Sequence, residues 1–195
     1  MGYEIVVVGT SLGGLTALQI LFSGLPDDFA VPMAVVQHRS AESQDTMLKV
    51  LRRYTPLRIR EPLDKEPVQS GYIYIAPPDY HLLVERGHFA LSTDSVVSYA
   101  RPSIDVLFDS AADVYKSKVI GVVLTGANSD GAAGARRIKA AGGVVLVQDP
   151  TTAECAVMPN AAIRDVKVDR ILMLEEIGPC LASLCRNNEN FNEAA

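Results

Sequence analysis

The sequence lacks the features that place a protein in a membrane or outside the cell. No run of about 18 apolar residues occurs, and the apolar run at residues 5–8 is too short even for the hydrophobic part of a signal peptide. The three cysteines, Cys155, Cys180 and Cys185, form no C-x-x-C pair and have no metal-ligand spacing. We therefore expect no secretion signal and no membrane insertion, and we expect reduced thiols in a cytoplasmic protein.

Basic residues are fewer than acidic residues in this sequence. The chain has 18 lysines and arginines against 23 acidic residues, which gives a formal net charge of −5 at pH 7. Phosphate binding requires clustered basic side chains. The pairs Arg52-Arg53 and Arg136-Arg137 are too short to be more than solvated helix faces. We expect no nucleic-acid partner.

Histidines are few and isolated. The three of them, His38, His81 and His88, form no H-x-x-x-H or H-E-x-x-H pattern, so we expect no metal centre. His81 and His88 lie in or near a predicted hairpin, and we interpret them as structural or surface residues. His38 differs from both because it directly follows a predicted strand.

The chain does have an alternation of strand-like and helix-like segments. Its 195 residues suit one domain with a single core, and 48% of them are hydrophobic. Short β-branched runs are typical of strands buried on both faces, and apolar positions at a period near 3.6 predict the helices between them. The predicted strands are 3–8, 31–37, 57–61, 119–124, 143–147 and 170–174, and the predicted helices are 15–25, 44–54, 103–114, 131–141, 157–164 and 177–184.

The middle of the chain has a different pattern. Residues 71–76 alternate in polarity, and residues 81–84 and 89–92 read as two short strands on either side of a turn. We interpret this stretch as an antiparallel hairpin region. The fold class is then α/β, with a doubly wound, mostly parallel sheet in three layers and an antiparallel hairpin region. We expect one domain over residues 1–186 and a disordered tail over residues 187–195.

In doubly wound sheets the ligand site lies outside the carboxyl ends of the strands. The turn at residues 9–14 follows the first strand and matches G-x-S-x-G between a strand and a helix. Such a turn exposes the hydroxyl of Ser11 beside the free N–H groups of the next helix. Two other interpretations stay open: a structural turn, and a dinucleotide loop, which is disfavoured because Gln37-His38 stands where an acidic residue should hold the ribose.

Two further strand ends carry residues that complement a serine nucleophile. A serine hydroxyl is almost un-ionised at neutral pH and needs a neighbouring base, and His38 is predicted to lie on the same rim of the sheet. Asp130 follows the strand at 119–124 and can orient an imidazole, or it can serve as the N-cap of the next helix. Together these residues suggest a hydrolase with Ser11 as nucleophile, His38 as general base and Asp130 as the residue that orients the histidine.

Nearly the whole chain, residues 3–184, resembles the catalytic domain of the chemotaxis protein-glutamate methylesterases (CheB). The order Ser, His, Asp differs from the Ser, Asp, His order of α/β-hydrolases. The resemblance is carried by the G-x-S-x-G-G turn at 9–14, the pair Gln37-His38, the segments at 71–77 and 101–108, the segments at 124–126 and 130–134, and the step Met158-Pro159.

The resemblance implies that Ser11, His38 and Asp130 are the catalytic triad. It implies hydrolysis of glutamyl methyl esters on the cytoplasmic helices of methyl-accepting chemotaxis receptors, with deamidation of certain receptor glutamines as a related activity. It implies no metal and no organic cofactor. From the segment that starts at Arg101 we also expect this arginine to border the substrate groove.

Three departures from the family pattern motivate an alternative. Leu12 stands where the family usually has threonine, and Ala127-Asn128 replaces the usual Met-Gly. The chain also begins directly at the first esterase strand, so we expect it to lack the phosphorylatable receiver domain. The alternative is a CheB-like signalling or binding module with weak or no activity. A nucleotide-binding domain is a third hypothesis, disfavoured by His38.

Overall fold

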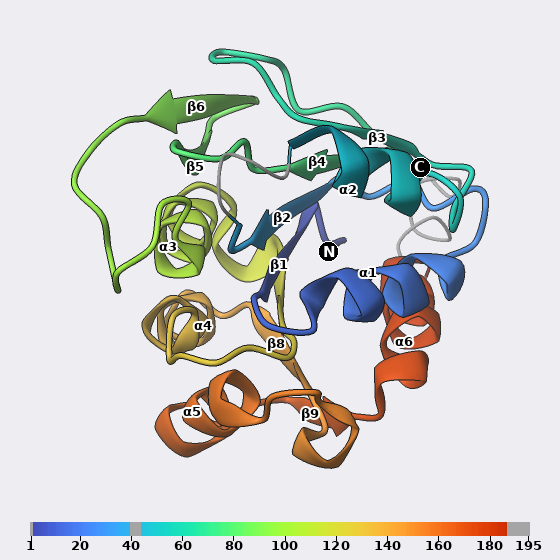
Figure 1. Ribbon diagram of the computed structural model, residues 1–195, viewed down its shortest axis with the longest axis vertical. Coiled ribbons are helices and arrows are strands. Elements are labelled where there is room, and N and C mark those ends of the chain that lie inside the picture. The colour runs from blue at the N-terminus through green and yellow to red at the C-terminus, as the bar shows by residue number, and fades with distance from the viewer. Residues whose placement is uncertain (1, 40–43, 187–195) are drawn as a thin grey trace.

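The structure, a computed structural model, describes residues 2–39 and 44–186. In this part of the chain seven strands form one sheet in the order β3-β4-β2-β1-β7-β8-β9, and every neighbouring pair is parallel (Figure 1). The strands are β1 (Ile5–Thr10), β2 (Met33–Gln37), β3 (Arg58–Arg60), β4 (Tyr72–Ile75), β7 (Val119–Val123), β8 (Val144–Gln148) and β9 (Arg170–Leu172). The predicted α/β class is confirmed.

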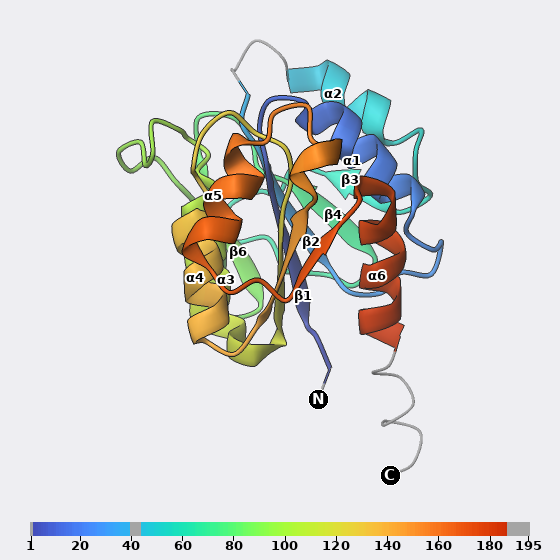
Figure 2. The ribbon, with the colours of Figure 1, turned by 90° about the horizontal axis from the view of Figure 1, so that it is seen from below.

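Helices cover both faces of the sheet and make three layers (Figures 1 and 2). One face packs against α1, α2 and α6, and the other packs against α3, α4 and α5. The helices are α1 (Gly14–Ser23), α2 (Gln44–Leu51), α3 (Ile104–Tyr115), α4 (Ala132–Ala140), α5 (Val157–Asp165) and α6 (Leu174–Arg186). No helix among the described residues is long and apolar enough to cross a membrane.

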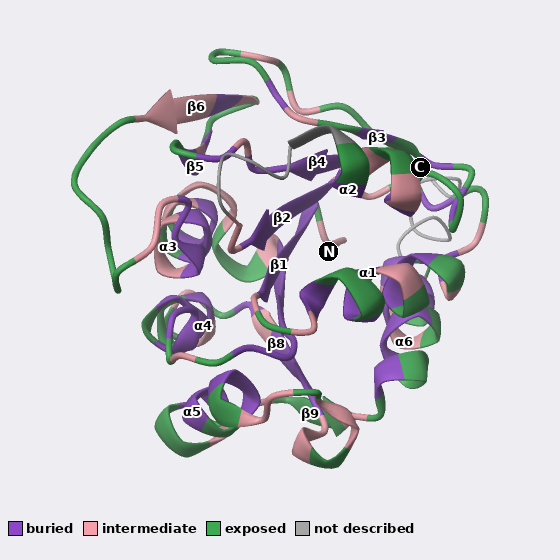
Figure 3. Ribbon diagram, viewed as in Figure 1, coloured by how far each residue is buried: buried purple, intermediate pink, exposed green. Residues whose placement is uncertain are grey.

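The position of β1 at the centre of the sheet explains why its sequence is apolar without a break. Its side chains alternate between the faces of the sheet, so that Val6 and Val8 join the core under α1 and α6, whereas Ile5 and Val7 join the core under α3. Both faces are covered, and the buried colour of Figure 3 runs through the middle of the sheet. A strand in this position has no polar face to present.

Two further strands, β5 (His81–Glu85) and β6 (His88–Ser92), form a separate antiparallel sheet. They pair from His81 opposite Ser92 to Glu85 opposite His88, as the hairpin prediction required. Figure 1 shows this hairpin outside the main sheet, on the side that carries α3. The segment from β6 to α3 brings the chain back to the carboxyl edge of the main sheet.

The prediction that residues 71–76 belong to the hairpin region is wrong. Their strand, β4, lies inside the main sheet and is parallel to β2 and β3. The alternation suggested one polar face, but Tyr74 is completely buried. Its hydroxyl accepts a hydrogen bond from the Gln69 N–H at 3.1 Å and donates to the Pro67 carbonyl at 3.3 Å. With its hydroxyl satisfied, a tyrosine can occupy a strand that is buried on both faces.

Both ends of the chain differ from expectation. The first strand, β1, covers Ile5–Thr10 and not residues 3–8. Helix α6 begins at Leu174, before the predicted start at residue 177. The predicted disordered tail, residues 187–195, lies outside the described residues.

Candidate active site

The carboxyl ends of three neighbouring strands meet at one rim of the sheet. Starting from β1, the chain adds β2, β3 and β4 on one side and then β7, β8 and β9 on the other. The direction of winding therefore reverses at β1, and such a switch point leaves a crevice at the carboxyl ends of the strands. The turns after β1, β2 and β7 carry Ser11, His38 and Asp130, so the structure brings the three predicted residues to this rim.

The turn that holds Ser11 is fixed through its backbone. The Ser11 N–H donates to the Thr125 carbonyl at 3.0 Å, and the Gln37 side chain donates to the Ser11 carbonyl at 2.8 Å. Gly13 has a left-handed φ of 78°, and a Cβ on Gly14 would collide with Gln37 Oε1. Only glycines allow this turn, which sets Ser11 directly before the N-terminus of α1.

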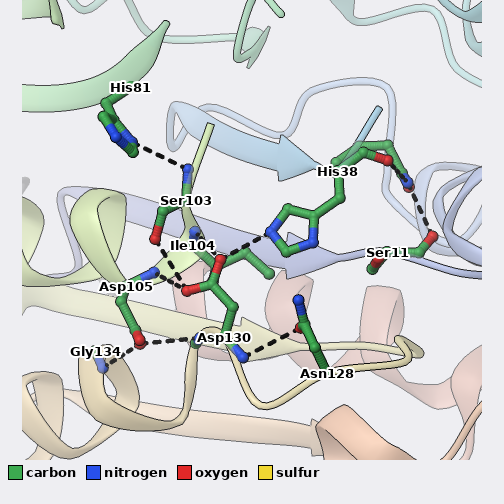
Figure 4. Close-up of polar contacts among 11 residues, drawn as sticks. Ser11, His38, His81, Ser103, Ile104, Asp105, Asn128, Asp130 and Gly134 are labelled. Carbon is green, nitrogen blue, oxygen red and sulfur yellow. Dashed lines mark hydrogen bonds and ion pairs between the residues drawn. The ribbon is translucent and has the colours of Figure 1, made fainter. Parts of the chain in front are cut away.

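His38 and Asp130 are hydrogen bonded to each other. His38 Nε2 lies 2.8 Å from Asp130 Oδ2, and Asp130 is completely buried whereas the His38 side chain is 13% exposed. An ionised carboxylate only accepts, so Nε2 carries the proton and Nδ1 is left as an acceptor. Figure 4 shows Ser11 on the far side of the imidazole from Asp130. No hydrogen bond joins the Ser11 hydroxyl to His38 in the described part of the chain.

Asp130 accepts three more hydrogen bonds, all from the start of α3. Its donors are the Ser103 hydroxyl at 3.0 Å, the Ile104 N–H at 2.8 Å and the Asp105 N–H at 3.0 Å. The helix that follows Asp130 has Gly131 as its N-cap, with no side-chain cap bond. Asp130 therefore caps α3, a helix remote in sequence, and does not cap α4.

Asp105 in turn caps helix α4. Its Oδ1 accepts from the N–H groups of Gly131 at 2.9 Å and Gly134 at 2.7 Å, so that it caps α4 from within α3. Each of the two helices thus has its free N–H groups satisfied by a carboxylate beside the other helix. Figure 4 shows the Asp130 carboxylate beside the imidazole of His38 and the Asp105 carboxylate on the far side of Asp130.

The two carboxyl groups have opposite pKa shifts. Burial alone would raise the pKa of Asp130, but hydrogen bonds from His38 and from the N–H groups of Asp105 and Ile104 outweigh it and lower this pKa. Burial raises the pKa of Asp105 to about 6, the Asp130 charge adds to the rise, and the bonds from Gly134 and Gly131 oppose it. Asp130 therefore stays ionised beside His38 at neutral pH.

The other histidines have structural contacts. His81 is buried, its Nδ1 accepts from the Ser103 N–H at 3.2 Å, and its Nε2 donates to the Ser95 carbonyl at 3.1 Å. It therefore supports Ser103, one of the donors to Asp130. His88 lies 2.7 Å from Glu85 on the hairpin. Neither side chain reaches the rim.

Two hollows adjoin His38. The first, of about 400 Å³, contains Ser11 and the half-exposed Leu12. The second, of about 440 Å³, has both Arg101 and His38 in its wall. The Arg101 guanidinium donates to the carbonyls of Thr93 at 2.8 Å and Asp94 at 3.0 Å. His38 lines both hollows.

No group of three His, Cys, Asp or Glu side chains within residues 2–39 and 44–186 lies close enough together to hold a metal ion. The cysteines are free thiols, and burial raises the pKa of Cys185 to about 12, which keeps this thiol protonated. The ionisable groups at and beside the rim include His38, Asp130, Asp105, Arg39, Arg101 and Glu154.

The fold and the rim define a class of protein: a doubly wound α/β domain with an Asp-oriented histidine beside a serine turn. Comparison with known proteins gives the family. The CheB methylesterase family matches residues 6–181, and the chain belongs to this family.

Relatives and a solved structure agree with this assignment. A Leptospira interrogans protein is 46% identical over 189 residues, which cover 96% of this chain and 98% of that protein. An Anaeromyxobacter dehalogenans protein named protein-glutamate methylesterase/protein-glutamine glutaminase 2 is 42% identical over 183 residues, 94% of this chain but 54% of its own length. The crystal structure of the Thermotoga maritima CheB methylesterase catalytic domain matches with a TM-score of 0.89 at 35% identity, covering 94% of this chain and 100% of that one.

Sequence reasoning missed Ser103 and Asp105. The available signal was the start of α3, where Ser103 precedes an acidic residue in the first turn. That pattern predicts a helix start but does not say which carboxylate from another segment completes it.

Proposed function

We propose that the chain is a serine esterase that hydrolyses methyl esters of glutamate side chains on chemotaxis receptors. In this proposal Ser11 is the nucleophile, His38 the general base and Asp130 the residue that orients and stabilises the imidazole. The observation that carries it is the 2.8 Å bond between His38 Nε2 and the buried, ionised Asp130, which leaves Nδ1 on the side of Ser11. Membership of the CheB methylesterase family and the names of its relatives supply the substrate class.

The first half of the reaction forms an acyl-enzyme. The Ser11 oxygen attacks the ester carbonyl carbon while its proton moves to His38 Nδ1, and the carbonyl π pair moves to the oxygen, which becomes an oxyanion. The imidazolium that forms is stabilised by Asp130 through Nε2. When the tetrahedral intermediate collapses, the C–OCH₃ bond breaks and the methoxy oxygen takes the proton from Nδ1, which releases methanol.

The second half repeats these steps with water. A water molecule gives one proton to Nδ1 while its oxygen attacks the acyl carbon. The bond between the acyl carbon and the Ser11 oxygen then breaks, and Ser11 takes the proton from Nδ1. The glutamic acid that forms loses its remaining proton to solvent and is released as the carboxylate. A glutamine amide would react in the same way, with ammonia as the first leaving group, which agrees with the second activity in the relatives' names. In this proposal the protein acts in the cytoplasm, where it would reach the receptor helices.

The test is methanol release from methylated receptor membranes. We expect release by the wild type, and loss of at least about a thousandfold for Ser11→Ala, because the nucleophile is removed. Ser23→Ala, at the exposed C-terminal end of α1, is the control and should keep the wild-type rate. A folded wild type that releases no methanol would contradict the proposal and favour a signalling or binding module.

A further inference from the structure

Asn128 lies between β7 and α4 at the edge of the site. It is half-buried and forms part of the wall of the hollow that contains His38. Figure 4 shows its side chain rising from the loop below the imidazole, with the amide nitrogen on the side of His38 and Ser11. This residue has no role in the steps derived above.

The orientation of the Asn128 amide is fixed by one hydrogen bond. Its Oδ1 accepts from the Asp130 N–H at 3.2 Å. Only the oxygen of an amide can accept a bond from a backbone N–H, so the two ends cannot be exchanged without losing it. The Nδ2 group, with two N–H donors, therefore points away from Asp130 and donates to none of the described residues.

We propose that Asn128 is a further catalytic residue whose Nδ2 donates a hydrogen bond to the oxyanion formed when Ser11 attacks the substrate. The proposal rests on the proposed function. The oxyanion gains its charge as the carbonyl π pair moves to oxygen, and a donor held in place beforehand stabilises that charge more than the neutral carbonyl. The amide is neutral, so it stabilises the oxyanion without placing a positive charge beside the imidazolium that forms on His38.

The position of Asn128 also separates this chain from the usual family pattern. A glycine at this position would offer backbone N–H groups alone, whereas Asn128 adds a side-chain donor from the same loop. Asp130 orients the histidine through its carboxylate and orients Asn128 through its own N–H. One residue thus positions both the base and the additional donor.

The test distinguishes the acceptor role of Asn128 Oδ1 from the donor role of Nδ2. Asn128→Asp keeps an oxygen that can accept from the Asp130 N–H but replaces the donor by a second oxygen. The probe is 4-nitrophenyl acetate, whose Ser11-dependent hydrolysis needs no receptor. We expect kcat/KM to fall about a hundredfold or more in Asn128→Asp and in Asn128→Ala, the size of effect typical of one lost oxyanion donor. Ser129→Ala, at the exposed neighbouring position, should keep the wild-type value.

Asn128→Asp adds a second carboxyl group near His38, so rates are compared on the plateau of each pH profile. If Asn128→Asp keeps the wild-type plateau rate, Asn128 serves only as an acceptor in the turn and the proposal is wrong. A wild type that hydrolyses the nitrophenyl ester through Ser11 but leaves receptor esters intact would instead overturn the receptor as substrate. The failures of the two proposals are therefore distinguishable.

Discussion

At the scale of single residues, Asp105 and Asp130 show how one geometry gives two carboxyl groups opposite properties. Asp130 has four donors, one of them the histidine, and its pKa is lowered. Asp105 has two donors on one oxygen, a partly buried site and a charged neighbour, and its pKa is raised to about 6. The ionised form of Asp130 stabilises the folded protein, whereas the ionised form of Asp105 destabilises it.

The sign of the Asp105 effect follows from linkage. In the unfolded chain an aspartate titrates near 3.9, so between about pH 4 and pH 6 the folded protein binds more protons than the unfolded one. The contribution of Asp105 to stability is therefore largest below pH 4 and is lost as the pH rises towards 6. An asparagine would keep both hydrogen bonds through its oxygen and would not ionise.

We therefore predict that Asp105→Asn stabilises the protein at pH 7.5 by about 1–2 kcal/mol, allowing for the solvent exposure of the carboxyl group. The gain should disappear at pH 4. Urea unfolding at several pH values measures it, and Asp113→Asn, exposed on the same helix, is the control. A gain that is equal at all pH values would assign the effect to packing and not to ionisation.

Residues of the site could be predicted from the sequence where a strand end determines their position, and not where packing between helices does. Ser11, His38 and Asp130 follow strand ends, and the rule for parallel sheets brings such positions together without knowledge of side-chain directions. Ser103 and Asp105 reach the site through the crossing of α3 over the start of α4. That contact is set by packing between segments, and no local pattern in the sequence encodes it.

At the scale of elements, α6 shows how tertiary packing overrides local propensity. Gly178 and Pro179 have low helix propensity, although both lie inside the predicted helix 177–184. In the structure the helix runs through both. Gly178 is needed because the backbone of α6 lies against the end of α1: a Cβ there would lie 2.8 Å from the Gly24 carbonyl carbon and from the Leu21 carbonyl oxygen.

This contact predicts an effect opposite to helix propensity. Gly178→Ala would gain up to about 1 kcal/mol in an isolated helix. Here we expect it to destabilise the protein by about 1–3 kcal/mol, because the two backbones must move apart. Denaturant unfolding measures the change, with Ser183→Ala on the exposed face of α6 as control. An increase in stability would show that the two helices separate at little cost.

The strand β4 gives the complementary lesson at the same scale. Its tyrosines suggested a half-exposed strand, and the polarity pattern placed it with the hairpin. The buried hydroxyl of Tyr74 is satisfied by the loop that precedes β4, in a contact between residues five and seven apart. A polarity pattern counts tyrosine as polar because it does not show that Gln69 and Pro67 satisfy the hydroxyl.

At the scale of the whole molecule, the sheet is most protected at its centre. Strand β1 is completely buried, has parallel neighbours on both sides and is covered by helices on both faces. Strand β9 is at one edge and is largely exposed. Local openings near the edge cost less than the global free energy of unfolding, whereas exposure of β1 requires global unfolding.

We therefore predict that the β1 amides exchange hydrogen only through global unfolding, with protection that falls in parallel with stability as urea is added. The β9 amides should exchange by local opening, at a rate that is nearly independent of low urea concentrations. Hydrogen exchange measured by mass spectrometry or NMR distinguishes the two. Equal protection of both strands would mean that the sheet opens as one unit.

Asp130 is hydrogen bonded to His38 and also caps helix α3. These two sets of contacts constrain how this molecule can change over evolutionary time. Ser11 and His38 can be replaced at little structural cost, but loss of Asp130 leaves three donors at the start of α3 without their acceptor. A descendant that abandoned hydrolysis would therefore be expected to retain this aspartate. Its presence in a related sequence is then evidence of ancestry, and only the serine and the histidine report whether the chemistry has been kept.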